Sequence, residues 1–324
     1  MQQLKMYFCV LRITKMMMSR SKTWSIFITA VIATTLTVTY FLILGSSNNE
    51  EPQVVRMEVP IAYRAVKIPD SVSFAGEPVP VERFDTKESL DRELLVNSYF
   101  HSQTLRLIKL APRYFSIIEP ILEEKGVPDD FKYLAVAESG LNPRAVSPAR
   151  AVGLWQFLAT TGQEYGLEVN SEVDERYHVE KSTYAACDYL LKAYSRYGSW
   201  SLVAAAYNGG LAGIERQVKR QKVDVYYDLL FGEETSRYVF RIIALKLIME
   251  NPAEYNFLIA EDEKYPVIET RDIVVEGRVD DFADFAFQHN INYKLLKDFN
   301  PWLRENNLTN TGKKKYTIKV PVLD

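Results

Sequence analysis

Several residue types that often define a function are scarce in this 324-residue sequence. It has two cysteines and three histidines, and its formal net charge is only -3 at pH 7. This near balance of charge lacks the polybasic character of proteins that bind DNA or RNA, so no nucleic-acid partner is expected. The histidines at positions 101, 178 and 289 lie far apart and in no ligand spacing, so neither a metal site nor any other cofactor is expected.

A long uncharged run stands near the N-terminus. From Thr23 to Gly45 there is no charged residue, and this run would span roughly 30 Å as a helix, about one hydrocarbon thickness. Five basic residues and no acidic residue precede it, whereas Glu50 and Glu51 follow it. The positive-inside rule therefore predicts that residues 1–22 are cytoplasmic, that residues 23–45 anchor the chain in the inner membrane, and that the rest lies in the periplasm.

Two questions about this N-terminal region stay open. A cleaved signal peptide is the alternative to an anchor, but its apolar region usually has about 7 to 15 residues and this one is longer. Met16, Met17 and Met18 directly precede part of the basic cluster, so translation starting there is an alternative to Met1. Cys9 and Cys187 would lie on opposite sides of the membrane, so no disulfide is expected between them.

The rest of the chain divides into three parts by its patterning. Residues 46–86 contain five prolines and no helical period, which is typical of a spacer. Residues 87–258 contain amphipathic runs of about 10 to 20 residues that stop at Gly, Pro or Asn, so a mainly α domain is expected. Residues 267–322 read as a strand, two short helices and a strand, a small β-α-α-β module.

One carboxylate in the α domain stands where a core residue would be expected. Asp129 is a candidate N-cap, and the positions i, i+3, i+4 and i+7 of the following helix face are Phe131, Leu134, Ala135 and Glu138. Glu138 also lies in the last helical turn, before Gly140, where the helix dipole disfavours a negative charge. Burial and dipole both predict a pKa raised from about 4.3 towards roughly 6, which suits a general acid. The alternative is a solvated glutamate at a frayed helix end.

Two further stretches place polar side chains beside glycine or between aromatic rings. Tyr207 and Asn208 end a helical run immediately before Gly209 and Gly210, which indicates either two ligand-binding side chains or an ordinary glycine cap. Gln156 stands between Trp155 and Phe157. Aromatic rings beside an amide suit a sugar, and a pair of core aromatics is the alternative.

Together these stretches resemble the lytic transglycosylases of the soluble-transglycosylase (SLT) catalytic domain, and among them the membrane-bound murein transglycosylase D type. The order and spacing match over about 170 residues in five motifs, which here read Glu138-Ser139, Pro143-Arg144-Ala145-Val146-Ser147, Gly153-Leu154-Trp155-Gln156, Ala206-Tyr207-Asn208, and Glu234-Thr235 with Tyr238-Val239. The chain departs from the family pattern at Arg150, where glycine is common, and at Leu158-Ala159, where Met-Pro is usual.

The resemblance implies a lysozyme-like helical fold and cleavage of the β-1,4 bond between N-acetylmuramic acid and N-acetylglucosamine in peptidoglycan. Glu138 would protonate the leaving oxygen and then, as a carboxylate, take the proton from the muramic acid C6 hydroxyl, so a 1,6-anhydro ring closes. One carboxylate then suffices, whereas ordinary glycosidases use two. By the same resemblance the glycan groove would be lined by Ser147, Gln156, Tyr207, Asn208, Glu234 and Tyr238, with Tyr207 or Tyr238 hydrogen-bonded near Glu138.

In residues 267–322 the stretches IVVEGRVDDFADFAFQHNI, LLKDFNP and YTIKVP resemble a degenerate lysin motif (LysM) module. This leaves open whether the module binds peptidoglycan or serves as a structural cap. Two alternatives to a transglycosylase also remain at this stage. One is a lysozyme-like muramidase, in which Glu234 or Asp174 would position a water molecule. The other is a peptidoglycan-binding scaffold without activity, for which a buried acid would have no use.

Overall fold

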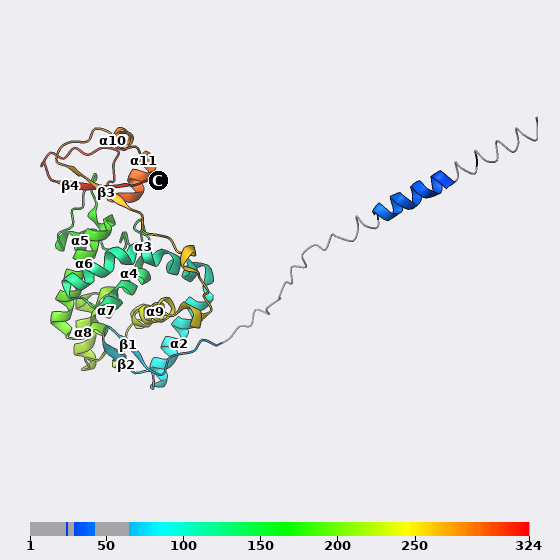
Figure 1. Cartoon of the computed structure of the whole chain (residues 1–324). Coiled ribbons are helices and arrows are strands. Elements are labelled where there is room, and N and C mark those ends of the chain that lie inside the picture. The colour runs from blue at the N-terminus through cyan, green and yellow to red at the C-terminus, as the bar shows by residue number, and fades with distance from the viewer. Residues whose placement is uncertain (1–23, 25–28, 43–64, 324) are drawn as a thin grey trace, which may run out of the picture. The chain divides into compact units, whose positions relative to one another are not determined.

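The computed structural model describes residues 24, 29–42 and 65–323 (Figure 1). The chain divides into two units, Met1–Tyr63 and Arg64–Asp324, and in the first of them residues 29–42 are helical. Within the described ranges, no helix is both long enough and apolar enough to cross a membrane. The predicted span at residues 23–45 lies partly outside these ranges.

The second unit is mainly helical, as the patterning predicts. Helix α9 (Glu233–Glu250) is its central element, because it packs on three other helices and eight of its 18 residues are buried. Such a helix is apolar around most of its circumference, and this requires neighbours on several sides. The other helices of this body are α2 (Phe84–Tyr99), α3 (His101–Lys125), α4 (Lys132–Ser139), α5 (Ala159–Glu164), α6 (Val179–Tyr197), α7 (Trp200–Gly209) and α8 (Leu211–Gln221).

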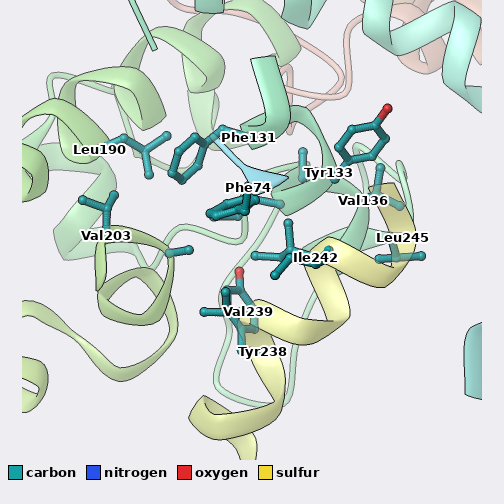
Figure 2. Close-up of a cluster of buried hydrophobic side chains, with 14 of the residues drawn as sticks. Phe74, Phe131, Tyr133, Val136, Leu190, Val203, Tyr238, Val239, Ile242 and Leu245 are labelled. Carbon is teal, nitrogen blue, oxygen red and sulfur yellow. The ribbon is translucent and has the colours of Figure 1, made fainter. Parts of the chain in front are cut away.

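A short hairpin precedes these helices, in the segment expected to be a spacer. Strands β1 (Val72–Phe74) and β2 (Glu77–Val79) pair antiparallel across a two-residue turn in which both residues have positive φ, the geometry of tight hairpins. Phe74 is fully buried and lies among side chains from α4, α6, α7 and α9 (Figure 2). Residues 65–86 therefore include a hairpin packed against the helices, whereas a spacer without such structure was expected. Prolines are compatible with an isolated two-stranded ribbon, because its outer edges need no amide donors.

The hairpin also fixes the start of α7. The carboxylate of Glu77 accepts hydrogen bonds from the backbone N–H of Trp200, at 2.5 Å, and from that of Ser201, at 3.0 Å. The first N–H groups of a helix have no partner within the helix and carry partial positive charge, so a carboxylate there both caps the helix and offsets its dipole. Strand β2, which is far from α7 in the sequence, thus holds the first turn of α7 in place.

A partly buried ion pair holds the same hairpin against α9. The ammonium group of Lys246 lies 2.7 Å from Asp130 and donates a hydrogen bond to the carbonyl of Ser73. Asp130 in turn accepts a hydrogen bond of 2.6 Å from the backbone N–H of Ala75. Each charge therefore has partners on the other segments, which is the condition for burying an ion pair without a large cost.

Helix α4 begins differently from the prediction. Residues Asp129–Phe131 form a 3-10 turn, and α4 follows as Lys132–Ser139. Asp129 is therefore the first residue of the turn and not an N-cap, and its carboxylate forms an ion pair of 2.5 Å with Lys132. The helix ends at Gly140, which has the left-handed φ of 59° that favours glycine.

The C-terminal module has the predicted β-α-α-β order. Strands β3 (Thr270–Val275) and β4 (Tyr316–Pro321) pair antiparallel with Thr270 opposite Pro321. Helices α10 (Phe282–Gln288) and α11 (Tyr293–Phe299) lie between them in the sequence, and each begins at a side-chain cap, Asp281 and Asn292. Polar residues before short apolar runs thus define both helices.

Gly153 is the point where the backbone of one loop touches that of another. A Cβ atom at this position would lie 1.9 Å from the carbonyl oxygen of Arg176, and the residue has a φ of 81°. No side chain fits between these two backbone segments. Gly166 has nearly the same φ, 83°, but a Cβ there would meet no atom within 4 Å.

We expect Gly153→Ala to destabilise the protein much more than Gly166→Ala. Both substitutions place alanine in the left-handed region, and only the first must also displace a backbone carbonyl. The additional loss in the free energy of unfolding should be about 1–3 kcal/mol, the usual cost of overpacking. Urea unfolding followed by tryptophan fluorescence measures it, and equal losses in the two variants would contradict the close approach.

Candidate active site

Glu138 lies in the last turn of α4, with its carboxyl group partly buried between α4 and α9. Its Oε1 atom accepts a hydrogen bond from the hydroxyl of Tyr238, on α9. Burial raises the pKa of Glu138 to about 7. The hydrogen bond from Tyr238 and the positive charge of Arg241 act in the opposite direction, whereas the negative charge of Glu234 adds to the rise. The raised pKa expected from the sequence is thus confirmed, with burial as its main cause.

Two tyrosines surround this carboxyl group. Burial together with the charge of Glu138 raises the pKa values of both Tyr207 and Tyr238 well above 10, so both hydroxyls stay protonated and act as hydrogen-bond donors. The Tyr238 hydroxyl donates to Glu138, and the Tyr207 hydroxyl donates to the carbonyl of Trp155 at 2.7 Å. Of the two candidates for a partner of the acid, the structure selects Tyr238.

Ser147 and Gln156 belong to one loop, which closes on itself. The backbone N–H of Ser147 donates to the carbonyl of Ala151 at 2.8 Å, and the N–H of Ala151 donates to the Ser147 hydroxyl at 3.0 Å. The amide nitrogen of Gln156 donates to two carbonyls of the loop, those of Ala145 at 3.3 Å and Gly153 at 2.8 Å. Both amide hydrogens of Gln156 are therefore used within the loop, and its amide oxygen is the part left for a ligand.

Arg150 lies in the turn of this loop, where the resembled family commonly has glycine. Its φ is 62°, in the left-handed region that glycine adopts at least cost. The family preference for glycine at this position thus has a backbone reason, and the arginine here accepts the strain.

The aromatic residues beside Gln156 are core residues and not a sugar platform. Trp155 is fully buried and its indole N–H donates to the hydroxyl of Thr183 at 2.9 Å. Phe157 is 3% exposed and packs near Tyr207. The hypothesis that these rings face a sugar is therefore wrong, and the alternative of a core aromatic pair is right.

Asn208 and Glu234 are the other predicted groove residues. The amide oxygen of Asn208 accepts a hydrogen bond of 2.9 Å from the hydroxyl of Thr235, which connects α7 to the start of α9. Glu234 is exposed and pairs with Arg241 at 3.0 Å. Glu234 thus influences Glu138 through its charge, while its carboxylate is engaged by an arginine.

Sequence reasoning missed Thr235 as a partner and Arg241 altogether. Glu234, Tyr238 and Arg241 stand at i, i+4 and i+7, so they share one face of α9. That spacing was visible in the sequence and would have identified Arg241 as the cation beside the acid.

Asp174, considered above as a base for water, is engaged elsewhere. Its two carboxylate oxygens accept hydrogen bonds from the guanidinium of Arg176, at 2.9 and 2.7 Å, and both side chains are buried. The backbone N–H of Asp174 donates to the carbonyl of Trp302 in the C-terminal module. A carboxylate held in this bidentate way serves structure.

Comparison with known proteins agrees with the motifs. Over 251 residues the chain is 29% identical to the membrane-bound lytic murein transglycosylase D of Escherichia coli strain K12, which covers 75% of this chain and 54% of that protein. The chain thus spans about half the length of the curated relatives it matches.

Two solved structures show a lower similarity. An inactive mutant of the lytic transglycosylase Slt from Pseudomonas aeruginosa is 19% identical, with a TM-score of 0.37 over 49% of this chain and 28% of that one. The 70 kDa soluble lytic transglycosylase of Escherichia coli is 20% identical, with a TM-score of 0.37 over 48% of this chain and 27% of that one.

Two family models match the chain, one within the helical body and one over the C-terminal module. Residues 115–228 match the transglycosylase SLT domain, a match that includes Glu138 and ends before α9. Residues 271–324 match the C-terminal LysM-like domain of soluble lytic transglycosylases. The chain therefore combines a mainly helical body that contains a match to the transglycosylase SLT domain with a C-terminal module that matches a LysM-like domain.

Proposed function

We propose that this protein is a peptidoglycan lytic transglycosylase that cleaves the bond between N-acetylmuramic acid and N-acetylglucosamine without water and leaves 1,6-anhydro-muramic acid ends. The observation that carries the proposal is a single carboxyl group, that of Glu138, with a pKa of about 7 and one hydroxyl partner. A group that is half protonated near neutral pH gives up and takes back a proton with little cost in either direction.

Both steps of the reaction then use the same side chain. Protonated Glu138 donates its proton to the glycosidic oxygen as the bond to the leaving sugar breaks. The resulting carboxylate accepts the proton of the C6 hydroxyl while that oxygen attacks the anomeric carbon, which restores the acid. Tyr238 donates a hydrogen bond to Glu138 and stabilises its carboxylate form between the two steps.

Both residues considered as the base of the rival hydrolytic mechanism are paired with arginines. Inverting and retaining glycosidases place a second carboxyl group about 5 to 9.5 Å from the acid. Of the two candidates for that group, Asp174 is buried in a bidentate pair with Arg176, and Glu234 is paired with Arg241. The internal C6 hydroxyl needs no such positioning, since it is already attached to the reacting sugar.

The glycan groove of this proposal is lined by Ser147, Gln156, Tyr207, Asn208, Glu234 and Tyr238. The amide oxygen of Gln156 and the exposed carboxylate of Glu234 are the groups among them that suit contact with sugar hydroxyl and amide groups. We further propose that residues 87–258 form the catalytic domain and that residues 267–322 add a second contact with peptidoglycan.

We also propose that the N-terminal segment anchors the protein in the inner membrane, with the catalytic domain in the periplasm. Two features support this. In the helix at residues 29–42, the hydroxyls of Thr34 and Thr35 bond to backbone carbonyls three and four residues earlier, which satisfies them without water. The relative from Escherichia coli is itself named as membrane-bound.

The products of digestion test the reaction. With purified sacculi as substrate, the released muropeptides should be lighter by one water than hydrolysis products and resistant to reduction by borohydride, because the ring is closed at C1. Glu138→Gln should reduce their release by about 10²- to 10⁴-fold, the usual share of general acid-base catalysis. The matched control is Glu164→Gln on α5, whose carboxylate is exposed and paired with Lys192, and which should release products at the normal rate.

Mass spectrometry before and after borohydride treatment reads these products. New ends that gain two hydrogens would identify a hydrolase, and near-normal release by the Glu138→Gln variant would refute the assignment of the acid. Loss of fold is monitored separately through the free energy of unfolding. Since the folded pKa lies above the ordinary 4.5, ionising Glu138 destabilises the protein as pH rises from about 4.5 to about 7, so the variant should be at least as stable at pH 8.

The pH dependence of kcat/KM tests the hydrogen bond from Tyr238. Activity requires protonated Glu138, so the alkaline limb should fall near pH 7 in the unmodified protein. The Tyr238 hydroxyl favours the carboxylate, so Tyr238→Phe should raise the pKa of Glu138 and move this limb to higher pH. Tyr226→Phe removes a buried hydroxyl that donates to the carbonyl of Ser236 and should leave the limb in place. A limb that moves to lower pH in the Tyr238 variant would contradict the direction of this effect.

Topology is tested by fractionation and by a fusion. An export-dependent reporter joined after residue 50 should be active, and the full chain should sediment with membranes and be released by detergent but not by salt. Recovery of a shortened soluble form would rule out the anchor while leaving export intact.

A further inference from the structure

The LysM-like module and the SLT domain share one hydrophobic cluster. Val152, Val173 and Tyr177 of the helical body are buried together with side chains of the module. The module side of this cluster is Val279, Phe282, Ala286, Ile291, Leu296, Trp302, Leu303, Leu308, Tyr316, Ile318 and Val320. Domains joined only by a tether keep separate cores, so these two are packed as one body at this place.

Backbone hydrogen bonds extend the contact. Val173 and Leu303 form an antiparallel bridge. The N–H of Asp174 donates to the carbonyl of Trp302 at 2.9 Å, and the N–H of Arg304 donates to the carbonyl of Glu172 at 2.7 Å. Residues 172–174 thus pair with residues 302–304 like two short strands, which fixes their register.

Polar side chains surround this pairing. The carboxylate of Glu172 accepts from the N–H and the hydroxyl of Thr309, at 2.9 and 3.0 Å. The carboxylate of Glu168 accepts from Lys314 and from the hydroxyl of Tyr316, each at 3.0 Å. On the other side of the loop, Arg144 pairs with Asp298 at 2.7 Å.

The contact continues inward to the candidate groove through a buried ion pair. Asp174 holds the guanidinium of Arg176, whose Nη1 donates to the carbonyl of Phe157 at 3.1 Å. The carbonyl of Arg176 touches Gly153 so closely that no Cβ fits there. Arg176 therefore holds residues 153–157 at both ends, and Gln156 lies between these two points.

We propose that the LysM-like module is a fixed part of the catalytic apparatus, which clamps residues 172–177 and, through the Asp174–Arg176 pair, positions the groove segment 153–157. Asp174 and Arg176 are positioning residues in this arrangement, since they act through Gln156 and its neighbours. The proposal rests on the proposed function for its kinetic consequence, and on the contacts alone for its structural one.

The physical basis is that a buried ion pair stabilises a structure only when all its hydrogen bonds are made. Arg176 is buried and its fork uses both oxygens of Asp174, so the position of Asp174 determines that of the guanidinium. Asp174 is in turn fixed by the module through its backbone. Loss of the module contact therefore frees the groove segment, although helices α4 and α9, which carry Glu138 and Tyr238, do not depend on it.

Amide hydrogen exchange of the full chain, read by mass spectrometry, tests the clamp without substrate. The first variant is Arg176→Lys, which keeps a positive charge beside Asp174 and loses the planar fork. The second is the double variant Glu168→Ala, Glu172→Ala, which removes contacts to the module and leaves its core intact. The control is Glu276→Ala, which removes an exposed ion pair with Lys315 within the module.

Exchange of residues 152–157 should be faster by about tenfold in the first variant and to a smaller degree in the second, with α9 unchanged in both and the control unchanged throughout. On soluble glycan strands, KM should rise by about tenfold with kcat within about threefold of normal, since the acid and its partner stay in place; misplacement by about 1 Å is enough for effects of this size.

Unchanged exchange of residues 152–157 in both variants would overturn the proposal, and so would an equal increase over residues 152–157 and α9, which indicates general loss of fold. The two proposals fail separately. Cleavage that persists in the Glu138→Gln variant refutes the catalytic assignment and leaves the exchange result standing, whereas normal exchange with Glu138-dependent cleavage refutes the clamp alone.

Discussion

The hydrogen bond between Tyr238 and Glu138 is the contact on which the site depends, because it joins the acid on α4 to a hydroxyl on α9. Glu138 stands at the end of a short helix that Gly140 terminates, and Tyr238 stands on a long helix with buried residues on several sides. The remaining architecture fixes the relative position of these helices. Hairpin β1–β2 is tied to α9 by Lys246, and α9 packs against α2, α4 and α7.

The electrostatics of the site follow from the balance between burial and a few partners. Burial raises the pKa of Glu138, while Tyr238 and Arg241 favour its charged form. One pKa unit corresponds to about 1.4 kcal/mol, which is comparable to a single hydrogen bond to a charged group. A single partner therefore decides whether the acid is protonated at neutral pH, and this makes the site sensitive to residues that never touch a ligand.

Features set by local periodicity were predictable from the sequence. The inward direction of Glu138, the helical body and the β-α-α-β module all follow from spacing and caps over fewer than about 20 residues. Features that depend on distant partners were not. The hairpin that buries Phe74 was hidden by its prolines, and the burial of Trp155 depends on Thr183. The Asp174–Arg176 pair has an ordinary i, i+2 spacing in the sequence. Its role depends on distant contacts, those of Asp174 with the module and those of Arg176 with the groove segment.

The capping of α7 by Glu77 has a consequence for the order in which the chain folds. The carboxylate and the N–H groups that it accepts from are 123 and 124 residues apart, and the hairpin also needs Lys246 on α9. Loops of that length close slowly. The contacts that offset the entropy lost on closure form only when the last helix is present. The first segment of the domain is therefore expected to wait for the last one during synthesis. Its apolar side chains, Phe74 among them, remain exposed for that time, so the chain depends on protection from aggregation until α9 has been made.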